Sequence, residues 1–328
     1  MKARHLTLTS LTCRRLRPSV RQFSTADSEQ FGYRKVAPGE KQGLVGGVFS
    51  SVADSYDVMN DLMSAGMHRL WKDEFVKMIG VPAMVKAQHP DSPLRFLDVA
   101  GGTGDISFRI IKALERAGEF VATEPTPPPS SPLEAAAAAG AEEAKGSSEG
   151  VAGDVKIAPN ALVTVSDINV DMLGVGKQRA LKRFTTPTLR QVAFQEANAQ
   201  ELPFADNSFD VYTIAFGLRN VTDLDLALRE ARRVLKPGGR FLCLEFSHIP
   251  PSYGPLGKLY DAYSFAAIPA LGQVVAGDRP SYQYLVESIR LFPKQEELVA
   301  RMEKCGFAYC AHTNFTAGVV AVHSGFKL

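Results

Sequence analysis

The sequence predicts an α/β fold: a mostly parallel sheet of seven strands with an antiparallel edge, preceded by a cap of helices. Three observations support this prediction. An apolar strand at 96–99 runs into a glycine-rich turn and then into a helix. Strands and helices alternate from there to residue 246. The chain closes with two strands joined by a short turn, which is typical of an antiparallel hairpin.

The glycine turn after the first strand indicates a nucleotide-type cofactor site. Residues 95–105 spell RFLDVAGGTGD, so Gly101, Gly102 and Gly104 leave the backbone open to a ligand. Apolar residues at helical spacing follow, which brings free amides and a helix dipole to the turn. A tight turn without a ligand is the alternative. A dinucleotide fingerprint would require a glycine where Ser107 stands, so a bound pyrophosphate is not indicated.

Residues 1–26 differ in composition from the rest of the chain. They contain six Lys or Arg and no Asp or Glu, with frequent Ser and Thr. This is typical of a mitochondrial transit peptide, with a candidate processing site at 21–24, and a flexible basic tail is the alternative. The whole chain has 37 basic and 35 acidic residues, and without this leader the balance becomes 31 against 35. We therefore expect no nucleic-acid partner.

The remaining composition is that of an ordinary globular domain, with 45% apolar and 22% charged residues. The four cysteines show neither a CxxC pair nor metal-ligand spacing, so no metal is expected. The longest apolar run, 266–277, is interrupted by Pro269 and Gln273 and falls short of the ~18 residues of a membrane span.

Residues 27–94 are predicted to form two or three short helices with a break at Gly66. Most of their aromatic and methionine side chains are expected to pack these helices on the main domain. A polar cluster within this apolar segment marks either a helix cap or a functional site. Its members are Tyr56, Asp57, Asn60, His68 and Arg69.

Between 119 and 158 the composition changes to proline, alanine, glycine, serine and glutamate, which predicts a disordered or loosely helical insertion. Asp167, at the end of the second strand 163–167, lies 63 residues after Gly104. Without the insertion this separation is 23, close to the ~20 residues expected for an acid that binds a ribose. Asp167 is therefore predicted to accept both ribose hydroxyls.

The later elements continue the alternation of strands and helices. Strands are expected at 189–195, 209–216 and 240–246, a helix at 223–235 with Thr222 as its cap, and a last helix at 293–306. Strands at 309–315 and 318–323 form the closing hairpin. A ligand of such a sheet binds outside the carboxyl ends of its parallel strands.

Several stretches together resemble one family, the ubiquinone and menaquinone biosynthesis C-methyltransferases. They are YDVMNDLMSAGMHRLWK (56–72), LDVAGGTGD (97–105), FGLRNVTD (216–223), RVLKPGGRFLCLEFS (233–247) and YDAYSF (260–265). The resemblance runs from about residue 31 to 328, excluding the insertion. It implies a methyltransferase domain over 95–328 with the Rossmann-like fold of class I S-adenosylmethionine-dependent methyltransferases, and S-adenosyl-L-methionine as cofactor.

The resemblance also implies which residues contact the cofactor. Besides the three glycines, these are Thr103 in the loop, Asp167 on the ribose, and Asn198 with Ala199 beside the adenine. Family members often carry a serine where this chain has Ala215, so a hydroxyl contact from that position is absent.

In such an enzyme the substrate is a hydroquinone whose hydroxyl proton, with a pKa of about 10, must leave near neutral pH. The site therefore has to stabilise a phenolate. Arg219 keeps its proton and is predicted to act electrostatically, with Asn220 and Tyr56 orienting the hydroxyl or a relay water. The alternatives are a surface ion pair of Arg219 with Asp223 or Asp225 and a turn role for Asn220.

Residues 249–292 form a long insertion between the fifth strand and the last helix, rich in aromatic residues, glycine and proline. A segment of this length is typical of a lid, which we expect to cover a polyprenyl chain and to touch the membrane interface. A structural cap and a dimer surface are the alternatives.

Together with the leader, the resemblance implies an enzyme of the mitochondrial matrix, peripheral on the inner membrane, that methylates 2-methoxy-6-polyprenyl-1,4-benzoquinol in ubiquinone biosynthesis. It implies a multi-subunit coenzyme Q synthesis complex as partner and leaves a homodimer open. Two alternatives remain. One is an NAD-dependent oxidoreductase, which shares the glycine turn and Asp167; the other is a methyltransferase-like scaffold without turnover, against which the intact glycine loop counts.

Overall fold

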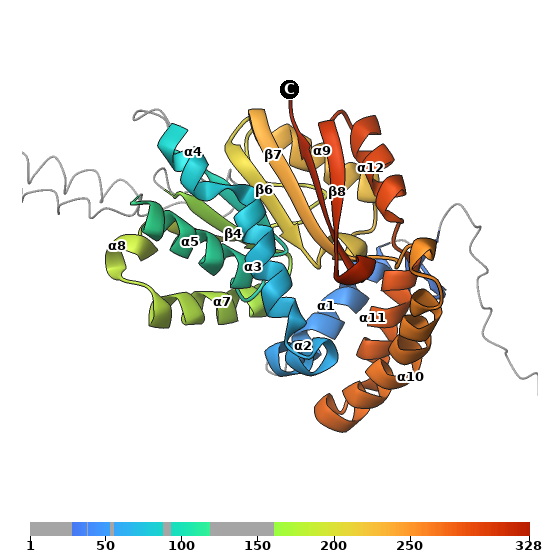
Figure 1. Ribbon diagram of the computed structural model, residues 1–328. Coiled ribbons are helices and arrows are strands. Elements are labelled where there is room, and N and C mark those ends of the chain that lie inside the picture. Colours follow the sequence, from blue (N-terminus) through green and yellow to red (C-terminus); the bar gives the residue numbers. More distant parts are fainter. Residues whose placement is uncertain (1–27, 38, 53–55, 88–92, 119–160) are drawn as a thin grey trace, which may run out of the picture.

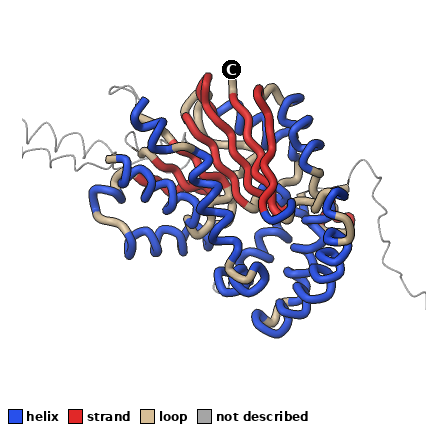
Figure 2. The backbone as a smooth tube through the Cα atoms, viewed as in Figure 1, coloured by secondary structure: helices blue, strands red, loops and turns tan. Residues whose placement is uncertain are grey.

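The computed structural model describes residues 28–37, 39–52, 56–87, 93–118 and 161–328 (Figure 1). The predicted transit peptide, 1–26, and the predicted insertion, 119–158, lie outside the described residues. The described part of the chain forms one layer of strands with helices on both sides and a further group of helices at one end (Figure 2).

The central sheet has seven strands, mostly parallel, as predicted. In their order across the sheet they are β5 (Val192–Glu196), β4 (Val163–Asp167), β3 (Phe96–Val99), β6 (Phe209–Ala215), β7 (Leu235–Phe246), β9 (Val320–Phe326) and β8 (Ala308–Phe315). The first five are parallel, and β9 pairs antiparallel with both β7 and β8. The predicted closing hairpin is present, but its second strand is inserted between β7 and the edge strand β8.

Two sets of helices cover the two faces of the sheet. One face carries α3 (Met67–Ile79), α4 (Val81–Ala87), α5 (Asp105–Ala117) and α7 (Val170–Arg183), followed by the short α8 (Thr186–Leu189). Phe75, Ile110 and Ile111 are fully buried there. The other face carries α9 (Leu224–Val234) and α12 (Gln295–Lys304), where Leu228 and Leu298 are fully buried. Because both faces are covered, β3 is buried at every position.

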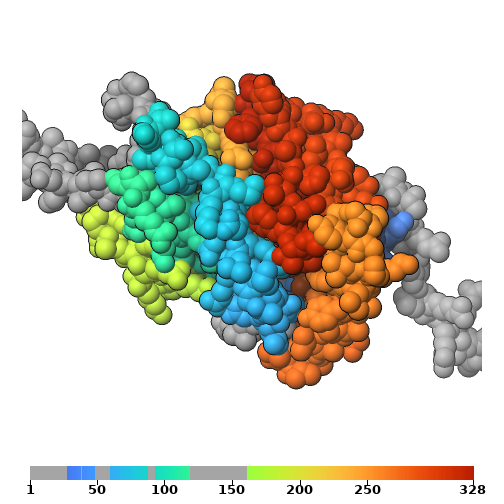
Figure 3. Space-filling model, in the orientation of Figure 1, coloured from blue at the N-terminus to red at the C-terminus, as the bar shows by residue number. Residues whose placement is uncertain are grey.

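A third group of elements lies at the end of the sheet where the parallel strands finish (Figure 1). It comprises β1 (Glu29–Phe31), β2 (Arg34–Val36), α1 (Glu40–Val52), α2 (Tyr56–Ser64), α10 (Leu256–Ala276), α11 (Arg279–Leu291) and the 3-10 helices η1 (Leu218–Asn220), η2 (Pro251–Tyr253) and η3 (Thr316–Gly318). The predicted lid at 249–292 is thus mainly a helical hairpin, in which α10 packs on α11 and on α2. Segments from opposite ends of the chain therefore lie side by side on the surface (Figure 3).

The N-terminal segment contains the predicted helices and one element that periodicity did not predict. Gly66 has a left-handed conformation, with φ 77°, at the start of α3, where the break was expected. The additional element is the hairpin β1–β2, in which the ring of Phe31 stacks on Tyr284 of α11 with 4.2 Å between centroids. A hairpin of two three-residue strands depends on such tertiary packing, because it is too short to be stable alone.

Several predicted boundaries are wrong. The strands predicted at 189–195 and 318–323 are Val192–Glu196 and Val320–Phe326, because short helical turns precede both. Thr222 does not cap α9; the side chain of Asp223 accepts a hydrogen bond from the Leu226 amide at 2.9 Å instead. β7 begins at Leu235, not at Arg240, because Leu235 already pairs with Phe209 of β6. The strand therefore includes the sequence Pro237-Gly238-Gly239, which closely follows the helix α9 and its C-cap.

The backbone of α7 passes directly beneath the glycine turn. A Cβ atom on Gly176 would lie 2.6 Å from the carbonyl oxygen of Gly102, closer than any real contact, so only glycine allows this approach. Gly174, in the same helix, has no atom within 4 Å of the corresponding position.

Gly176→Ala should therefore lower the free energy of unfolding by ~1–3 kcal/mol, because the turn or the helix must shift to admit the methyl group. Gly174→Ala is the matched control and should raise it by about 1 kcal/mol, because alanine is the better helix former. Urea unfolding of both variants checks this. Equal stabilisation by the two alanines would contradict the close contact.

Candidate functional site

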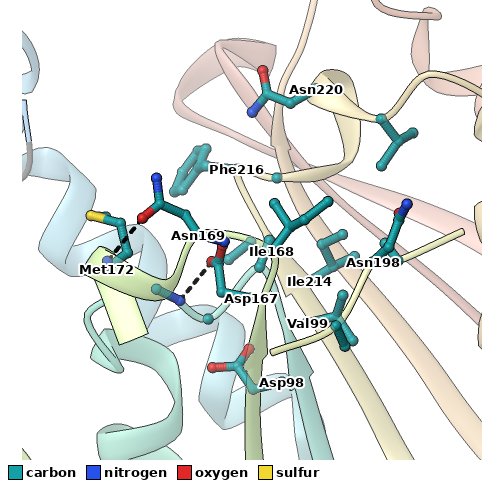
Figure 4. Close-up of a pocket in the computed structure, with 18 of the residues that line it drawn as sticks. Asp98, Val99, Asp167, Ile168, Asn169, Met172, Asn198, Ile214, Phe216 and Asn220 are labelled. Carbon is teal, nitrogen blue, oxygen red and sulfur yellow. Dashed lines mark hydrogen bonds between the residues drawn. The ribbon is translucent and has the colours of Figure 1, made fainter. Parts of the chain in front are cut away.

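A cavity at the carboxyl ends of the parallel strands brings most of the predicted site residues together. It is bounded by the ends of β3, β4 and β6, by the segment after β5 and by α1. The predicted residues that line it are Gly101, Gly102, Thr103, Asp167, Asn198, Ala199 and Asn220. Figure 4 shows Asp98, Asp167 and Asn198 around this cavity, with Phe216 and Asn220 across from Asp98.

Three other predicted positions lie elsewhere. Gly104 is the left-handed residue that precedes α5, with φ 82°. Arg219 lines a neighbouring cavity together with Lys41 and Tyr284. Tyr56 is the first residue of α2, and its side chain lies outside the part of the chain that the structure describes.

A buried carboxyl group holds the glycine turn in place. Asp98, at the end of β3, is fully buried and accepts hydrogen bonds from the Ser107 amide at 3.1 Å, the Ser107 hydroxyl at 2.6 Å and the Thr213 hydroxyl at 2.8 Å. Burial raises the pKa of Asp98 to about 6, although these hydrogen bonds oppose the shift. Ser107, which stands where a dinucleotide fingerprint has glycine, therefore uses its side chain to fix the turn.

The alanine at position 100 occupies a conformation that favours glycine. Its φ is 52°, in the left-handed region, which costs an alanine roughly 1–2 kcal/mol. The methyl group fits because residue 217 is glycine: a Cβ atom on Gly217 would lie 2.3 Å from the Cβ of Ala100. A glycine just after the neighbouring strand β6 thus makes room for the alanine of the turn.

Asp167 anchors the turn from the second strand. Its Oδ2 accepts from the Gly102 amide and its Oδ1 from the Asn169 amide, both at 2.9 Å. Burial raises its pKa, and these two backbone hydrogen bonds oppose the shift. Each carboxylate oxygen has a second acceptor site, so Asp167 retains the capacity to accept from two ligand hydroxyls. This is the capacity that the sequence spacing predicted.

Helix α1 covers the cavity, a contribution for which the sequence contained no local signal. Val45 and Gly46 line the cavity. The Asn169 side chain, which also caps α7, donates to the Gly46 carbonyl at 3.2 Å. The Lys41 ammonium donates to the Val221 carbonyl at 2.7 Å. Both contacts hold the helix over the ligand site from segments more than 100 residues away in the chain.

Arg219 forms a buried ion pair rather than a surface one. Its Nη1 lies 3.1 Å from both carboxylate oxygens of Glu245, which is fully buried at the end of β7, and its own side chain is 6% exposed. The alternative partners considered from the sequence, Asp223 and Asp225, are therefore wrong. Glu245 was missed, although a carboxylate within the apolar sequence LCLEF indicates a buried partner.

The ion pair changes what Arg219 can contribute. Burial raises the pKa of Glu245, and the guanidinium opposes that shift. Both oxygens of Glu245 are occupied by the Arg219 side chain and by the amides of Arg219 and Phe246, so Glu245 is not an available base. The predicted electrostatic role of Arg219 stays a prediction, and its charge is offset by this carboxylate.

Of the two neighbouring residues predicted to act on the substrate, Arg219 and Asn220, only Asn220 lines the cofactor cavity. The hydroxyl of Tyr284, from α11, donates to its Oδ1 at 3.0 Å. This hydrogen bond leaves the amide nitrogen of Asn220 directed toward the cavity, as Figure 4 shows. Tyr284 was not predicted as a site residue, and burial raises its pKa to about 12, so it remains a donor.

A second, apolar cavity of about 400 Å³ lies between the N-terminal helices and the α10–α11 hairpin. Its apolar lining includes Met63, Trp71, Phe246, Tyr260, Ile268 and Leu285. The rings of Phe216 and Phe246 lie 4.8 Å apart between centroids, and Phe216 lines the cofactor cavity while Phe246 lines the apolar one. This pair of rings therefore lies at the boundary between the two cavities.

Two members of the predicted polar cluster, His68 and Arg69, form contacts between helices of the N-terminal segment. Asp61 accepts from His68 Nε2 and from Arg69 Nε, each at 2.8 Å, and so joins α2 to α3. Burial lowers the pKa of His68, although Asp61 opposes this shift. Asn60 and His68 also line the apolar cavity, and the side chain of Asp57 lies outside the described residues.

Comparison with known proteins gives a family match over nearly the whole chain. The model of the ubiE/COQ5 methyltransferase family matches residues 36–327. The ubiquinone/menaquinone biosynthesis C-methyltransferase UbiE of Brucella abortus is 48% identical over 298 residues, which cover 91% of this chain and 90% of that protein. The protein of the same name from Brucella anthropi is 47% identical, over 91% of this chain and 92% of that protein.

Solved structures of methyltransferases also match. A Thermotoga maritima methyltransferase, described as a possible histamine N-methyltransferase, is 17% identical over 86% of this chain and 98% of its own, with a TM-score of 0.43. Phosphoethanolamine N-methyltransferase 2 of Haemonchus contortus, in complex with S-adenosyl-L-methionine, is 15% identical over 76% of this chain and 52% of its own, also with a TM-score of 0.43.

The glycine turn, the sheet topology and the family match define an S-adenosylmethionine-dependent methyltransferase. The chain belongs to the ubiE/COQ5 methyltransferase family. S-adenosyl-L-methionine is its cofactor, as predicted, and its activity is C-methylation in ubiquinone/menaquinone biosynthesis. The cavity fits this cofactor, because it combines the free acceptor sites of Asp167 with an acidic lining that suits a sulfonium cation.

Asp167→Asn should weaken S-adenosylmethionine binding by ~1–3 kcal/mol, because an amide has one acceptor oxygen in place of two and carries no charge. Glu196→Gln, an exposed charge change at the end of β5, is the control and should leave the affinity unchanged. Calorimetric titration measures both. Unchanged affinity of the Asp167 variant would show that another acid binds the ribose.

Proposed function

We propose that this enzyme methylates a ring carbon of 2-methoxy-6-polyprenyl-1,4-benzoquinol in ubiquinone biosynthesis. The observation that supports this substrate is the apolar cavity beside the cofactor cavity. A benzoquinol ring between the two cavities would have its reacting carbon on the cofactor side of Phe216 and its isoprenoid tail on the side of Phe246. Burial of the tail contributes about 0.8 kcal/mol for each methylene group.

The bound cofactor supplies an activated methyl group. The protein has to make a ring carbon of the quinol electron-rich. This requires the quinol hydroxyl next to that carbon to lose its proton to solvent. Asn220 is suited to donate a hydrogen bond to the resulting oxyanion, because Tyr284 already occupies its carbonyl oxygen. The ring proton leaves after the new carbon–carbon bond forms, so the net products are the methylated quinol, S-adenosylhomocysteine and one proton.

Arg219 is proposed to assist from behind Asn220. Its side chain is 6% exposed and lies over the ring of Phe246, with 5.6 Å between the guanidinium carbon and the ring centroid. The positive charge of Arg219 acts through surroundings of low dielectric constant. It therefore stabilises the negative charge of the phenolate more than it stabilises the neutral quinol.

The predicted location and partners belong to the same proposal. We propose a matrix enzyme, directed by residues 1–26, that binds the matrix side of the inner membrane and works within a coenzyme Q synthesis complex, with a homodimer as one arrangement. Exposed apolar residues on α10, a helix that borders the apolar cavity, support the membrane contact: Leu259 is 68% exposed and Val274 is 83% exposed. In the described part of the chain, no helix is both long enough and apolar enough to span a bilayer.

The tail prediction can be tested with two substrates. Wild-type enzyme should have a kcat/KM at least ~100-fold higher for a prenylated 2-methoxybenzoquinol than for the same quinol without a tail. Leu285→Trp fills the apolar cavity and should remove at least ~10-fold of this preference, while Val274→Trp adds the same ring on the exposed side of α10 and should remove none.

Equal rates with the two quinols would contradict the proposed substrate. Cofactor binding without turnover of any quinol would favour the alternative of a non-catalytic scaffold, and the oxidoreductase alternative has no support from the family match.

The role of Arg219 needs a variant that preserves the fold. Arg219→Ala alone would leave the Glu245 carboxylate buried and unpaired, at a cost of ~3–5 kcal/mol of stability. The double variant Arg219→Gln with Glu245→Gln removes both charges together. Its kcat should fall by ~10²–10³ with unchanged cofactor affinity, as for a lost oxyanion donor.

This deficit should shrink as the pH rises toward the ~10 at which a phenol ionises, because solvent then removes the proton without assistance. Stopped assays across pH 7–10, with folding followed by circular dichroism, measure it. Normal turnover of the double variant would restrict Arg219 to a structural role.

A further inference from the structure

Lys72 of α3 is a buried cation directed at the cofactor cavity. It is 5% exposed, and its Nζ lies 2.7 Å from Oδ2 of Asp105, the first residue of α5. Both residues line the cavity. A lysine this deeply buried requires a counter-charge, which Asp105 supplies between α3 and α5.

The charges around the cavity are not balanced. Among the described residues that line it, Lys72 is the one cation, and Asp98, Asp105 and Asp167 are acidic. Asp105 pairs with Arg109 as well as with Lys72; burial opposes its ionisation, but the two cations outweigh burial and lower its pKa to about 2. Arg109 is itself paired with Asp73 at 2.7 Å, so these two cations face two carboxylates. The Lys72 ammonium has three donors, of which Asp105 accepts one, so it can still donate to an anion in the cavity.

The strand order places this cation at one end of the cofactor. Across the sheet, the segment after β5 carries Asn198, β4 ends at Asp167, and β3 leads into the glycine turn and α5. With the adenine at Asn198 and the ribose at Asp167, the amino-acid end of S-adenosylmethionine reaches the start of α5. That end carries the only carboxylate of the cofactor.

We propose that Lys72 binds the α-carboxylate of S-adenosylmethionine, while Asp105 holds the ammonium group of Lys72 in position. The positive end of the α5 dipole adds to the attraction, because it lies at the same place. The assignment rests on the cofactor of the family and adds a residue outside the glycine loop and outside the ribose and adenine contacts. It also gives α3 a function in binding, besides its packing on the sheet.

The test compares S-adenosylmethionine with its decarboxylated form, which keeps the sulfonium, the amine, the ribose and the adenine. Calorimetric titration of the full-length protein should show that the wild type prefers the carboxylated ligand by about 10- to 100-fold, as expected for hydrogen bonds to a charged group. Lys72→Met should reduce this preference to less than about threefold, and Lys72→Arg should retain most of it.

Lys77→Met is the matched control, because Lys77 lies on the exposed side of the same helix and pairs with Glu74. It should keep the full preference. The double variant Lys72→Met with Asp105→Asn removes both charges, so no carboxylate is left without its lysine partner, and it should lose the preference to the same extent as Lys72→Met. The ratio of the two affinities is independent of the fraction of folded protein, so misfolding alone does not imitate the expected result.

Retention of the wild-type preference in Lys72→Met, or an equal loss of affinity for both ligands, would overturn the proposal. If the wild type bound neither ligand, the cofactor assignment itself would fail, which is a different result from failure of the Lys72 assignment.

Discussion

The arrangement of the site depends on the buried carboxyl of Asp98. It joins three elements, because it lies at the end of β3 and accepts hydrogen bonds from Ser107 of α5 and Thr213 of β6. These hydrogen bonds hold the start of α5 against the sheet and so determine the path of the turn between them. Asp167 then fixes the turn from β4 through the Gly102 amide. A cofactor that binds largely through backbone contacts requires a turn held this firmly.

The cap of helices converts this common scaffold into a two-part site. α1 covers the polar cavity, and α2, α3, α10 and α11 enclose the apolar one. The rings of Phe216 and Phe246 form the boundary. The charged cofactor and the proposed polyprenyl quinol have opposite solvation requirements, so a site for both would need a polar and an apolar compartment that meet at the reacting atoms.

Two ion pairs whose cations are buried lie beside these cavities, and in each the acid belongs to the sheet or to a helix packed on it. Glu245 belongs to β7 and Asp105 to α5, while their partners Arg219 and Lys72 come from a 3-10 helix and from the cap. Buried pairs are weak contributors to net stability but costly to break singly. Besides the roles proposed for Arg219 and Lys72, these pairs therefore hold η1 and α3 in a unique position relative to the sheet.

The sequence by itself determined the glycine turn and the alternation that builds the sheet, and it predicted Asp167 as the ribose acid from a count of residues across the predicted insertion. These features are readable because a turn, a strand period and a chain separation are properties of neighbouring residues. Only the tertiary structure decided which partners the charged residues have. Arg219 and Glu245 are 26 residues apart, Lys72 and Asp105 are 33 apart, and the residues that hold α1 over the cavity are more than 100 apart. Which cation meets which carboxylate depends on how the cap docks on the sheet and on which groups lose water there, and no local pattern contains that information.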